Sequence, residues 1–593
     1  MPSIPSGEIK TVIVHVRQKN GDIYVLERKI KYDPEKKYNK ILSAKLLSKI
    51  PKGSEIPVPT RAKRKKSDAN EADSKIVTAE RTRIGMMDII EHVGQVSGID
   101  DAVYGSTDYG TAQKIISLAR YLLASNGQTL PGIRTWQYNH PLPYEDGITE
   151  DVYHNLFKQI GMDESLQQEF FTRRCESLSE NDALAYDSST ISTYSNNQSD
   201  ARFGFNKAHD GLKTIKLLTL YSINSRQPVA FTKQPGNLPD VTSVVNALKQ
   251  LTALGIKTRE IITDNGYYSE SNISEMLQAG FDFITLAKTS IKWIRPEIDK
   301  NTDALHQFSS VCPFDPSING IVVPVKHDFV KVHKYASQKK GLKKGDTESF
   351  TKKIYIHIYF SQTRHNQANV DFNEELLELK RTLEEGIPIE ELSPSAQEKA
   401  TKYFKIKKWG SKLTVIPDNE AISEANKYQG YFVLISNREK NPFECLSKYR
   451  KRETIESFFR AEKQQADGSR ARVWGSDTLR GRMFVQFVAL CYYEYYCELI
   501  RKLKLELDKD IHEGQLSSNE LAVTKRLKSW VNNTPIYLQL QWFDTVESVK
   551  ISTKLRTYRW STEVTACDSL YLKKIGVRKR VNAIPCKPLL SPF

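Results

Sequence analysis

The chain has 593 residues, several times the roughly 100–150 residues of one domain, and therefore contains more than one folded unit. It carries 87 Lys and Arg residues against 71 Asp and Glu residues, and the net charge of +16 favours an extended polyanion over a small acidic metabolite as partner. Hydrophobic residues make up 39% and charged residues 27%, a globular composition that excludes a low-complexity or collagen-like chain.

Cysteine usage and the apolar segments bear on the cellular compartment. The seven cysteines are scattered and contain no CxxC pair, which predicts reduced thiols in a cytoplasmic protein. The N-terminal segment lacks the basic head and apolar stretch of a secretory signal. The longest apolar segment, Met483 to Tyr493, is interrupted by Gln486 and is shorter than the ~20 residues of a membrane span. We therefore expect a soluble, cytoplasmic protein without a membrane partner.

The first third of the chain predicts three regions. Two short strands around the turn Asn20-Gly21-Asp22 indicate a small β unit over residues 1–50. Residues 51–80 contain a basic run at 61–66 and no apolar periodicity, and we interpret them as a linker. Residues 81–180 have helical apolar spacing and predict a helical domain, a candidate for DNA binding. Whether two of its helices form a helix-turn-helix stays open, because any helical bundle has this pattern.

The next region predicts an α/β fold. Over residues 181–289 the pattern reads strand, strand, strand, helix, strand, helix, strand, which predicts three sequential strands followed by parallel strands added through crossover helices. Residues 290–429 interrupt this rhythm and indicate an inserted domain. The α/β pattern resumes over 430–500 with a strand at 431–436 and a single helix at 442–465, and residues 501–593 form a basic C-terminal region.

Two aspartates follow predicted strands of this fold. Asp187 follows the apolar residues 183–186, and Asp264 follows another strand and precedes Asn265-Gly266, a tight-turn signal. Because the carboxyl ends of parallel strands open on the same edge of a sheet, we expect the two carboxylates to lie there together. For either residue alone, a turn-forming or helix-capping role is the open alternative.

A third acid, Glu456, lies on the predicted helix 442–465. At 100° per residue it shares an arc of about 80° with Tyr449, Arg452, Arg460 and Lys463. A solvated face with ion pairs four residues apart is the open alternative. Two aspartates and a glutamate without His or Cys suit Mg²⁺ or Mn²⁺, and two such ions can promote an in-line phosphoryl displacement. No nucleophile elbow, Walker A loop or HExxH motif points to a different chemistry.

The motifs resemble a known family. The spacing Tyr449-x2-Arg452-x3-Glu456-x6-Lys463 matches the YREK signature of bacterial insertion-sequence transposases of the DDE class, in the insertion-sequence-four superfamily. The chain is similar to its long-chain members over roughly residues 80–500. The segments DSST at 187–190, PGNLPD at 235–240 and DNGY at 264–267 resemble the first two acidic motifs of that family.

This resemblance implies an α/β fold with a ribonuclease-H-like catalytic core, interrupted by a mainly β insertion domain. It implies that Asp187, Asp264 and Glu456 are the catalytic residues and the ligands of two Mg²⁺ ions, for which Mn²⁺ can substitute. The implied reaction is metal-dependent cleavage of DNA at transposon ends, followed by strand transfer into target DNA. The implied state is a homodimer bound to double-stranded DNA in the bacterial cytoplasm, associated with the nucleoid.

The resemblance also implies DNA-binding roles. Tyr449, Arg452 and Lys463 are expected to hold phosphates near the transposon end, and Arg460 on the same face is a further DNA-binding candidate. Tyr431, in the strand before the signature helix, is the candidate for stacking on a flipped base, with a core-packing role as the open alternative. A related nuclease, an inactive copy that only binds or nicks DNA, and a non-catalytic DNA-binding protein are the rival functions.

Overall fold

The computed structural model describes residues 9–33, 38–55, 57–59, 76–179, 182–206, 209–256, 260–332, 343, 345–409, 412–465, 468, 470–553 and 557–577. The chain divides into two compact units. One comprises Met1–Glu80 with Val549–Trp560, and the other comprises Arg81–Ser548 with Ser561–Phe593. The basic run at 61–66, predicted as part of a linker, lies outside the described residues.

The smaller unit contains an antiparallel four-stranded sheet rather than the single hairpin that the sequence predicts. Its strands are β1 (Ile9–Arg17), β2 (Ile23–Asp33), β3 (Tyr38–Ile50) and β4 (Val58–Pro59), in that order. A second sheet has the order β18 (Thr557–Ser561), β17 (Glu547–Thr553) and β5 (Ile76–Arg83). The sequence does not signal β3 because its apolar residues come in adjacent pairs with lysines between them and do not alternate.

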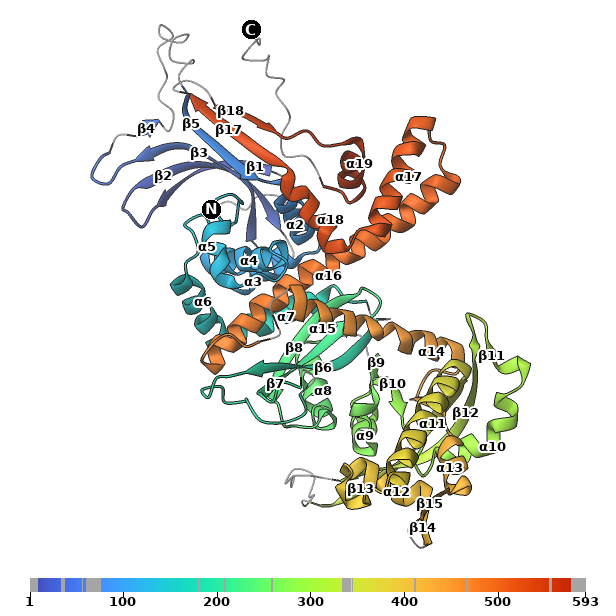
Figure 1. Ribbon diagram of the computed structural model, residues 1–593. Coiled ribbons are helices and arrows are strands. Elements are labelled where there is room, and N and C mark those ends of the chain that lie inside the picture. Colours follow the sequence, from blue (N-terminus) through green and yellow to red (C-terminus); the bar gives the residue numbers. More distant parts are fainter. Residues whose placement is uncertain are drawn as a thin grey trace. The chain divides into compact units, whose positions relative to one another are not determined.

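The larger unit is built on a nine-stranded mixed sheet (Figure 1). Its order is β11 (Val311–Cys312), β12 (Asp315–Val332), β13 (Thr347–Ser361), β16 (Tyr431–Ser436), β10 (Asp282–Ala287), β9 (Glu260–Thr263), β6 (Ala183–Thr193), β7 (Lys213–Ser222) and β8 (Gln227–Pro235). Strands β6, β7 and β8 pair antiparallel, whereas β9 runs parallel to β6 and β10 parallel to β9. The predicted strand sequence of this region is therefore confirmed.

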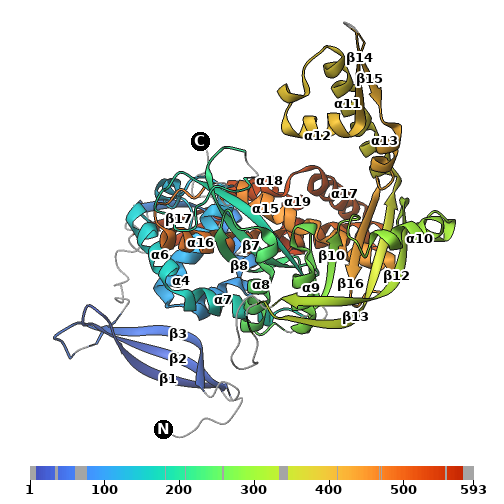
Figure 2. The same ribbon diagram turned by 90° about the horizontal axis from the view of Figure 1, so that it is seen from below.

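The insert at 290–429 differs from the expected mainly β domain. It begins with α10 (Arg295–Leu305), and its strands β11, β12 and β13 extend the central sheet, because β13 pairs with β16. The rest is a small helix-rich cluster that projects from the sheet in Figure 2. It contains α11 (Gln362–Glu384), α12 (Pro394–Tyr403), the hairpin β14 (Phe404–Trp409) and β15 (Lys412–Pro417), and α13 (Asn419–Asn426). The insert is thus mixed α/β.

Helices cover the sheet. The helical region 81–180 contains α2 (Gly85–Val96), α3 (Ile99–Ser106), α4 (Tyr109–Ala124), α5 (Ile133–Trp136), α6 (Glu150–Met162) and α7 (Glu164–Glu176). The long helix α16 (Ser476–Glu513) contacts α4, α6 and β8 and so joins this region to the sheet. Helix α4 is buried on almost all sides, so it is not available as a DNA-reading helix.

The remaining helices complete the unit. The crossover helices are α8 (Val244–Ala253) and α9 (Glu270–Gln278), and the C-terminal region adds α17 (Ser518–Asn533), α18 (Ile536–Trp542) and α19 (Ala566–Lys574). Among the described helices none combines the length and the apolar character that crossing a membrane requires.

The predicted single helix at 442–465 is two helices, α14 (Pro442–Lys451) and α15 (Glu453–Gln465). At Arg452 the backbone bonds are three residues apart: the Arg452 N–H donates to the Tyr449 carbonyl oxygen at 2.9 Å, and the Ile455 N–H donates to the Arg452 carbonyl oxygen at 2.9 Å. This tighter turn separates α14 from α15. The arc of side chains counted from Tyr449 therefore does not continue unchanged along α15.

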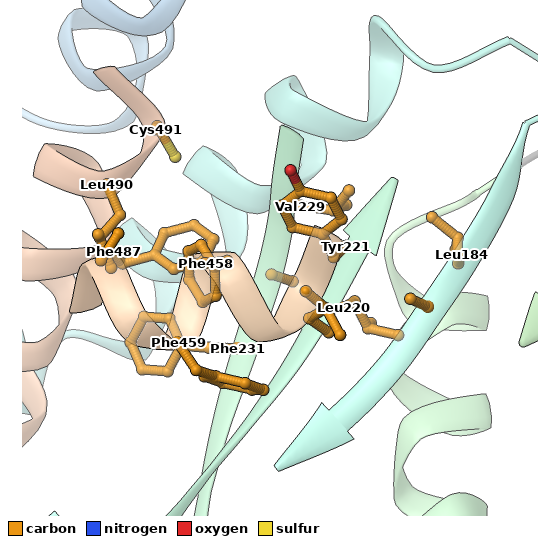
Figure 3. Close-up of a cluster of buried hydrophobic side chains, with 14 of the residues drawn as sticks. Leu184, Leu220, Tyr221, Val229, Phe231, Phe458, Phe459, Phe487, Leu490 and Cys491 are labelled. Carbon is orange, nitrogen blue, oxygen red and sulfur yellow. The ribbon is translucent and has the colours of Figure 1, made fainter. Parts of the chain in front are cut away.

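Aromatic packing fixes α15 on the sheet. Ile455 and Phe458 of α15 are fully buried. Phe458 contacts Tyr221 of β7 and Phe487 of α16, with ring centroids 5.9 and 6.4 Å apart. Figure 3 shows Phe458 and Phe459 among side chains from β7, β8 and α16. Burying such rings stabilises the fold by about 1.5–3 kcal/mol each, so the position of the next charged residues on α15 is well determined.

Candidate active site

The register of the sheet brings Asp187 and Asp264 together. The parallel pairing of β6 and β9 ends with Tyr186 opposite Thr263. Asp187 and Asp264 are the next residues, and neighbouring strands lie about 4.8 Å apart. Strand β6 does not end at Asp187 as the sequence suggests but continues to Thr193, paired with β7. Asp187 thus projects from a rigid strand at the point where β9 ends.

The backbone near each aspartate fixes its carboxylate. The Ser188 N–H donates to Asp187 Oδ1 at 2.8 Å, and the Asn265 N–H donates to Asp264 Oδ1 at 2.7 Å. Asp264 is the N-cap of the short 3-10 turn Asn265–Tyr267, so the turn-forming role considered for it is present. That role leaves Oδ2 of Asp264 available for other contacts.

Arg452 joins the three predicted acids. Its Nη1 donates to Asp187 Oδ2 at 3.1 Å, and its Nη2 donates to Glu456 Oε1 at 3.0 Å. The same Nη2 lies 3.8 Å from Asp264 Oδ2. Arg452 is only 6% exposed, whereas the side chain of Glu456 is 56% exposed. One guanidinium, at the break between α14 and α15, therefore contacts carboxylates from β6, from the end of β9 and from α15.

The charge of Arg452 is stabilised by this environment. Burial disfavours the guanidinium charge, but Tyr449 and the three carboxylates outweigh that effect and raise the pKa of Arg452 above its usual value. The cation is thus fully present at neutral pH and balances negative charge that would otherwise repel across the site.

Tyr449 is the second signature residue in this cluster. Its hydroxyl donates to Asp264 Oδ1 at 3.1 Å, and the Arg452 guanidinium lies 5.5 Å from the centroid of its ring. Burial raises the pKa of Tyr449 well above the usual value for a phenol, so the hydroxyl keeps its proton and acts as a donor. In this arrangement both Tyr449 and Arg452 contact acids.

The three other predicted DNA contacts lie outside the cluster. Lys463 is partly buried on α15, seven residues after Glu456. Arg460 is exposed and lines a separate cavity of about 290 Å³ together with Arg226, Glu494 and Arg501. Tyr431 is the first residue of β16; its hydroxyl lies 3.2 Å from His306 Nε2 and its ring is 5.2 Å from that of Phe360.

Two neighbours of the acids were not singled out from the sequence. Asp240, the last residue of the PGNLPD segment, binds the buried Lys216 of β7, whose Nζ is 2.7 Å from Asp240 Oδ1 and 2.6 Å from the Leu238 carbonyl oxygen. The Ser188 hydroxyl donates to the same Asp240 oxygen at 3.1 Å. A lysine within an apolar strand was the available signal, because a buried lysine requires an acidic partner.

The donor set is suited to a hard divalent cation. Three carboxylates without His or Cys are the oxygen ligands that Mg²⁺ and Mn²⁺ prefer. Within the described ranges no three His, Cys, Asp or Glu side chains are spaced to share one metal ion. At this site the Arg452 guanidinium contacts all three acids.

Comparisons with known proteins give one family. No curated protein matches the chain. A solved structure described as the cryo-EM structure of the piggyBac transposase synaptic complex with hairpin DNA covers 78% of this chain and 78% of its own, at 8% identity and a TM-score of 0.33. That likeness is too distant to carry an argument. The family model described as the transposase DDE domain matches residues 178–492, more than half of the chain. The chain therefore belongs to the DDE transposase family.

Proposed function

We propose that this protein is a DNA transposase that cleaves DNA at transposon ends and joins the freed ends to target DNA, with Asp187, Asp264 and Glu456 as its catalytic triad. The observation that carries this proposal is the convergence of these acids on Arg452. They come from three elements that are far apart in the sequence, and their carboxylates lie 3.0 to 3.8 Å from one guanidinium. Simple turn or capping roles do not require such convergence.

The sheet supports a ribonuclease-H-like core for this enzyme. The order β8-β7-β6-β9-β10 contains three antiparallel strands followed by two parallel ones, and α15 packs beside them. This arrangement presents a strand residue, a strand-end residue and a helix residue at one edge. Together with the YREK spacing, it supports assignment to the insertion-sequence-four superfamily.

Asp187, Asp264 and Glu456 would hold Mg²⁺ or Mn²⁺, and the bound ions would supply Lewis-acid activation for phosphoryl transfer. For the acids to do so, Arg452 must withdraw from between them. Its planar guanidinium is suited to a DNA phosphate, so withdrawal gives it the phosphate contact that the signature implies. Release of Asp264 by Tyr449 makes the Tyr449 hydroxyl available in the same way.

The remaining predicted DNA contacts have separate places in this proposal. Lys463 and Arg460 follow Glu456 on α15 and would contact DNA phosphates outside the cluster around Arg452. Tyr431 is on the strand at the other side of β10 and would meet the DNA away from the acids. Because two transposon ends must be processed together, we propose that the enzyme acts as a homodimer.

The test uses the DNA that flanks the coding region in its genome of origin. Duplexes carrying either flank are incubated with the purified protein in Mg²⁺, with and without a target plasmid. The proposal predicts nicks at the end of an inverted repeat and joined products with the plasmid. Cleavage without joined products would instead identify a nuclease, and binding without cleavage would identify the non-catalytic alternative.

A further inference from the structure

Four large aromatic side chains are exposed near the far end of β6. Tyr194, Phe203, Phe205 and Trp474 are 76%, 69%, 68% and 68% exposed. Exposing one ring is ordinary, but four in one region leave a large apolar area in water, which indicates an interaction surface. We call these four residues the ring surface. Neither the proposed triad nor its neighbours use them.

Contacts between the segments place residues of the ring surface near one another. The segment before α16 runs along the end of β6: the Ala471 N–H donates to the Ser192 carbonyl oxygen at 3.2 Å, and the Ser195 hydroxyl donates to the Trp474 carbonyl oxygen at 2.8 Å. Lys213 links the other side, because its Nζ lies 3.4 Å from Asn196 Oδ1 and 5.7 Å from the ring centroid of Phe203.

Cations lie among the rings. The Arg470 guanidinium is 5.1 Å from the ring centroid of Tyr194 and pairs with Asp210 at 3.0 Å. Arg202 donates to the carbonyl oxygen of Ala201, and Lys213 donates to an amide oxygen, so no described acid neutralises either of them. The ring surface therefore combines apolar faces with uncompensated positive charge.

We propose that the ring surface binds unpaired DNA nucleotides, whose bases stack on the four rings and whose phosphates contact Arg202 and Lys213. Stacking of bases on aromatic rings beside cations is how proteins hold single strands. In a duplex the base faces are covered by their neighbours, so a fully paired DNA would leave the rings exposed. A purely apolar partner would leave the two cations without counter-charges.

The location connects this surface to the proposed function, on which this step of the inference rests. From Asp187, strand β6 continues to its last residue, Thr193. At about 3.3 Å per residue, the ring surface therefore begins about 20 Å from Asp187. A DNA strand covers that distance in about six nucleotides at 3.4 Å each. A strand released at Asp187 by cleavage would thus reach the ring surface along β6.

The test measures binding of a fluorescent 20-nucleotide oligo(dT) by anisotropy in EDTA, with a 20-base-pair duplex as comparison. The full-length protein is expected to bind the single strand, and Phe203→Ala, Phe205→Ala and Trp474→Ala are each expected to weaken that binding roughly 5- to 100-fold. Duplex affinity should change less than twofold. Phe308→Ala is the matched control, since Phe308 is 92% exposed elsewhere in the larger unit.

Unchanged single-strand affinity in all three variants would overturn the inference, as would an equal loss of duplex affinity. The three replaced rings and that of the control Phe308 are exposed, so the four variants are expected to fold, and far-UV circular dichroism checks this. Because the assay contains no divalent cation, it does not depend on cleavage. If the protein cleaves DNA but the variants bind the single strand normally, the inference fails and the proposed function stands. If the protein does not cleave DNA, the result of the binding assay still holds.

Discussion

The Arg452 guanidinium lies 3.1 Å from the carboxylate of Asp187, although 265 residues separate them in the chain. The same group contacts Asp264 and Glu456. Arg452 thus provides one positive charge shared by three converging carboxylates. The residue lies at the break between α14 and α15.

Replacing Arg452 by Gln should destabilise the protein when divalent cations are absent. Loss of the buried cation leaves the Asp187 carboxylate without its Arg452 ion pair and beside two other carboxylates, at a cost of about 3 kcal/mol. We expect the Tm in EDTA to fall by several degrees and Mn²⁺ to raise the variant's Tm more than that of the wild type. Differential scanning fluorimetry measures both.

Arg460→Gln is the control for this experiment, because Arg460 is an exposed arginine of the same helix region outside the cluster. It should leave both the Tm and the response to Mn²⁺ unchanged. An Arg452→Gln variant as stable in EDTA as the wild type would show that the guanidinium does not balance the acids.

Tyr449→Phe removes the hydroxyl that bonds Asp264. A hydrogen bond to a charged group contributes about 1.5–3 kcal/mol, and Asp264 keeps its bond from the Asn265 N–H. We therefore expect a small fall in Tm and a cleavage rate reduced by about tenfold, which corresponds to the lower end of that range. Tyr138→Phe, at an exposed tyrosine elsewhere, is the control. Full cleavage activity of Tyr449→Phe would exclude a role for this hydroxyl.

Lys216→Met tests the support behind Asp187. The change leaves Asp240 without its cation. Asp240 accepts a hydrogen bond from the Ser188 hydroxyl, and the Ser188 N–H donates to Asp187. Removing one partner of a largely buried ion pair costs about 3 kcal/mol, so the Tm should fall by several degrees. Thermal unfolding of Lys216→Met and of the double variant Lys216→Met/Asp240→Asn measures this, and the double variant should recover part of the loss. If the double variant recovers none of the lost Tm, the destabilisation by Lys216→Met comes from altered packing and not from the unpaired charge of Asp240.

Glu494 predicts a pH dependence of stability. Burial raises its pKa from 4.5 to about 7, against a hydrogen bond from the Tyr221 hydroxyl that lowers it. Between pH 4.5 and about pH 7, Glu494 keeps its proton in the folded protein but has lost it in the unfolded chain. The stability that Glu494 contributes is therefore fully present below pH 4.5 and is lost as the pH rises to about 7, by about 3 kcal/mol in total.

Glu494→Gln removes this titration while keeping a side-chain oxygen for Tyr221. Its Tm relative to that of the wild type should rise between pH 5 and 8 and then level off. Thermal unfolding across that range measures the difference, with Glu453→Gln, at an exposed position, as control. A difference that is constant with pH would show that Glu494 is already ionised in the folded protein near pH 5.

Much of the fold follows from local patterns. The alternation of strands and helices over 181–289 predicts both the strand order and the parallel additions, because each crossover permits one hand. The extension of the sheet by β12 and β13 depends on pairing between β13 and β16, more than 70 residues apart, and no local pattern encodes such a partner. The break between α14 and α15 at Arg452 could not be predicted, because no Gly or Pro lies there. It coincides with the contacts that Arg452 makes to distant acids.

The three acids of the candidate site could be chosen from the sequence, but the side chains that contact them could not. Asp187, Asp264 and Glu456 could be chosen because strand ends and a helix face converge at one edge. Their common partner, Arg452, could not be predicted, because a sequence does not show whether an arginine contacts a phosphate or a carboxylate. The ion pair between Asp240 and Lys216 could not be predicted either, because Lys216 lies on β7, more than 20 residues earlier in the chain.

The most direct test of the account is the cleavage rate of transposon-end DNA in Mg²⁺ by Asp187→Asn, Asp264→Asn and Glu456→Gln, with Glu453→Gln from the same helix as matched control. If the three acids form the catalytic site, each replacement lowers the rate at least about a thousandfold. DNA binding and the rate of Glu453→Gln should stay within about twofold of the wild type, the ordinary range for a surface change. Cleavage by any one of the three variants at the wild-type rate would contradict the account.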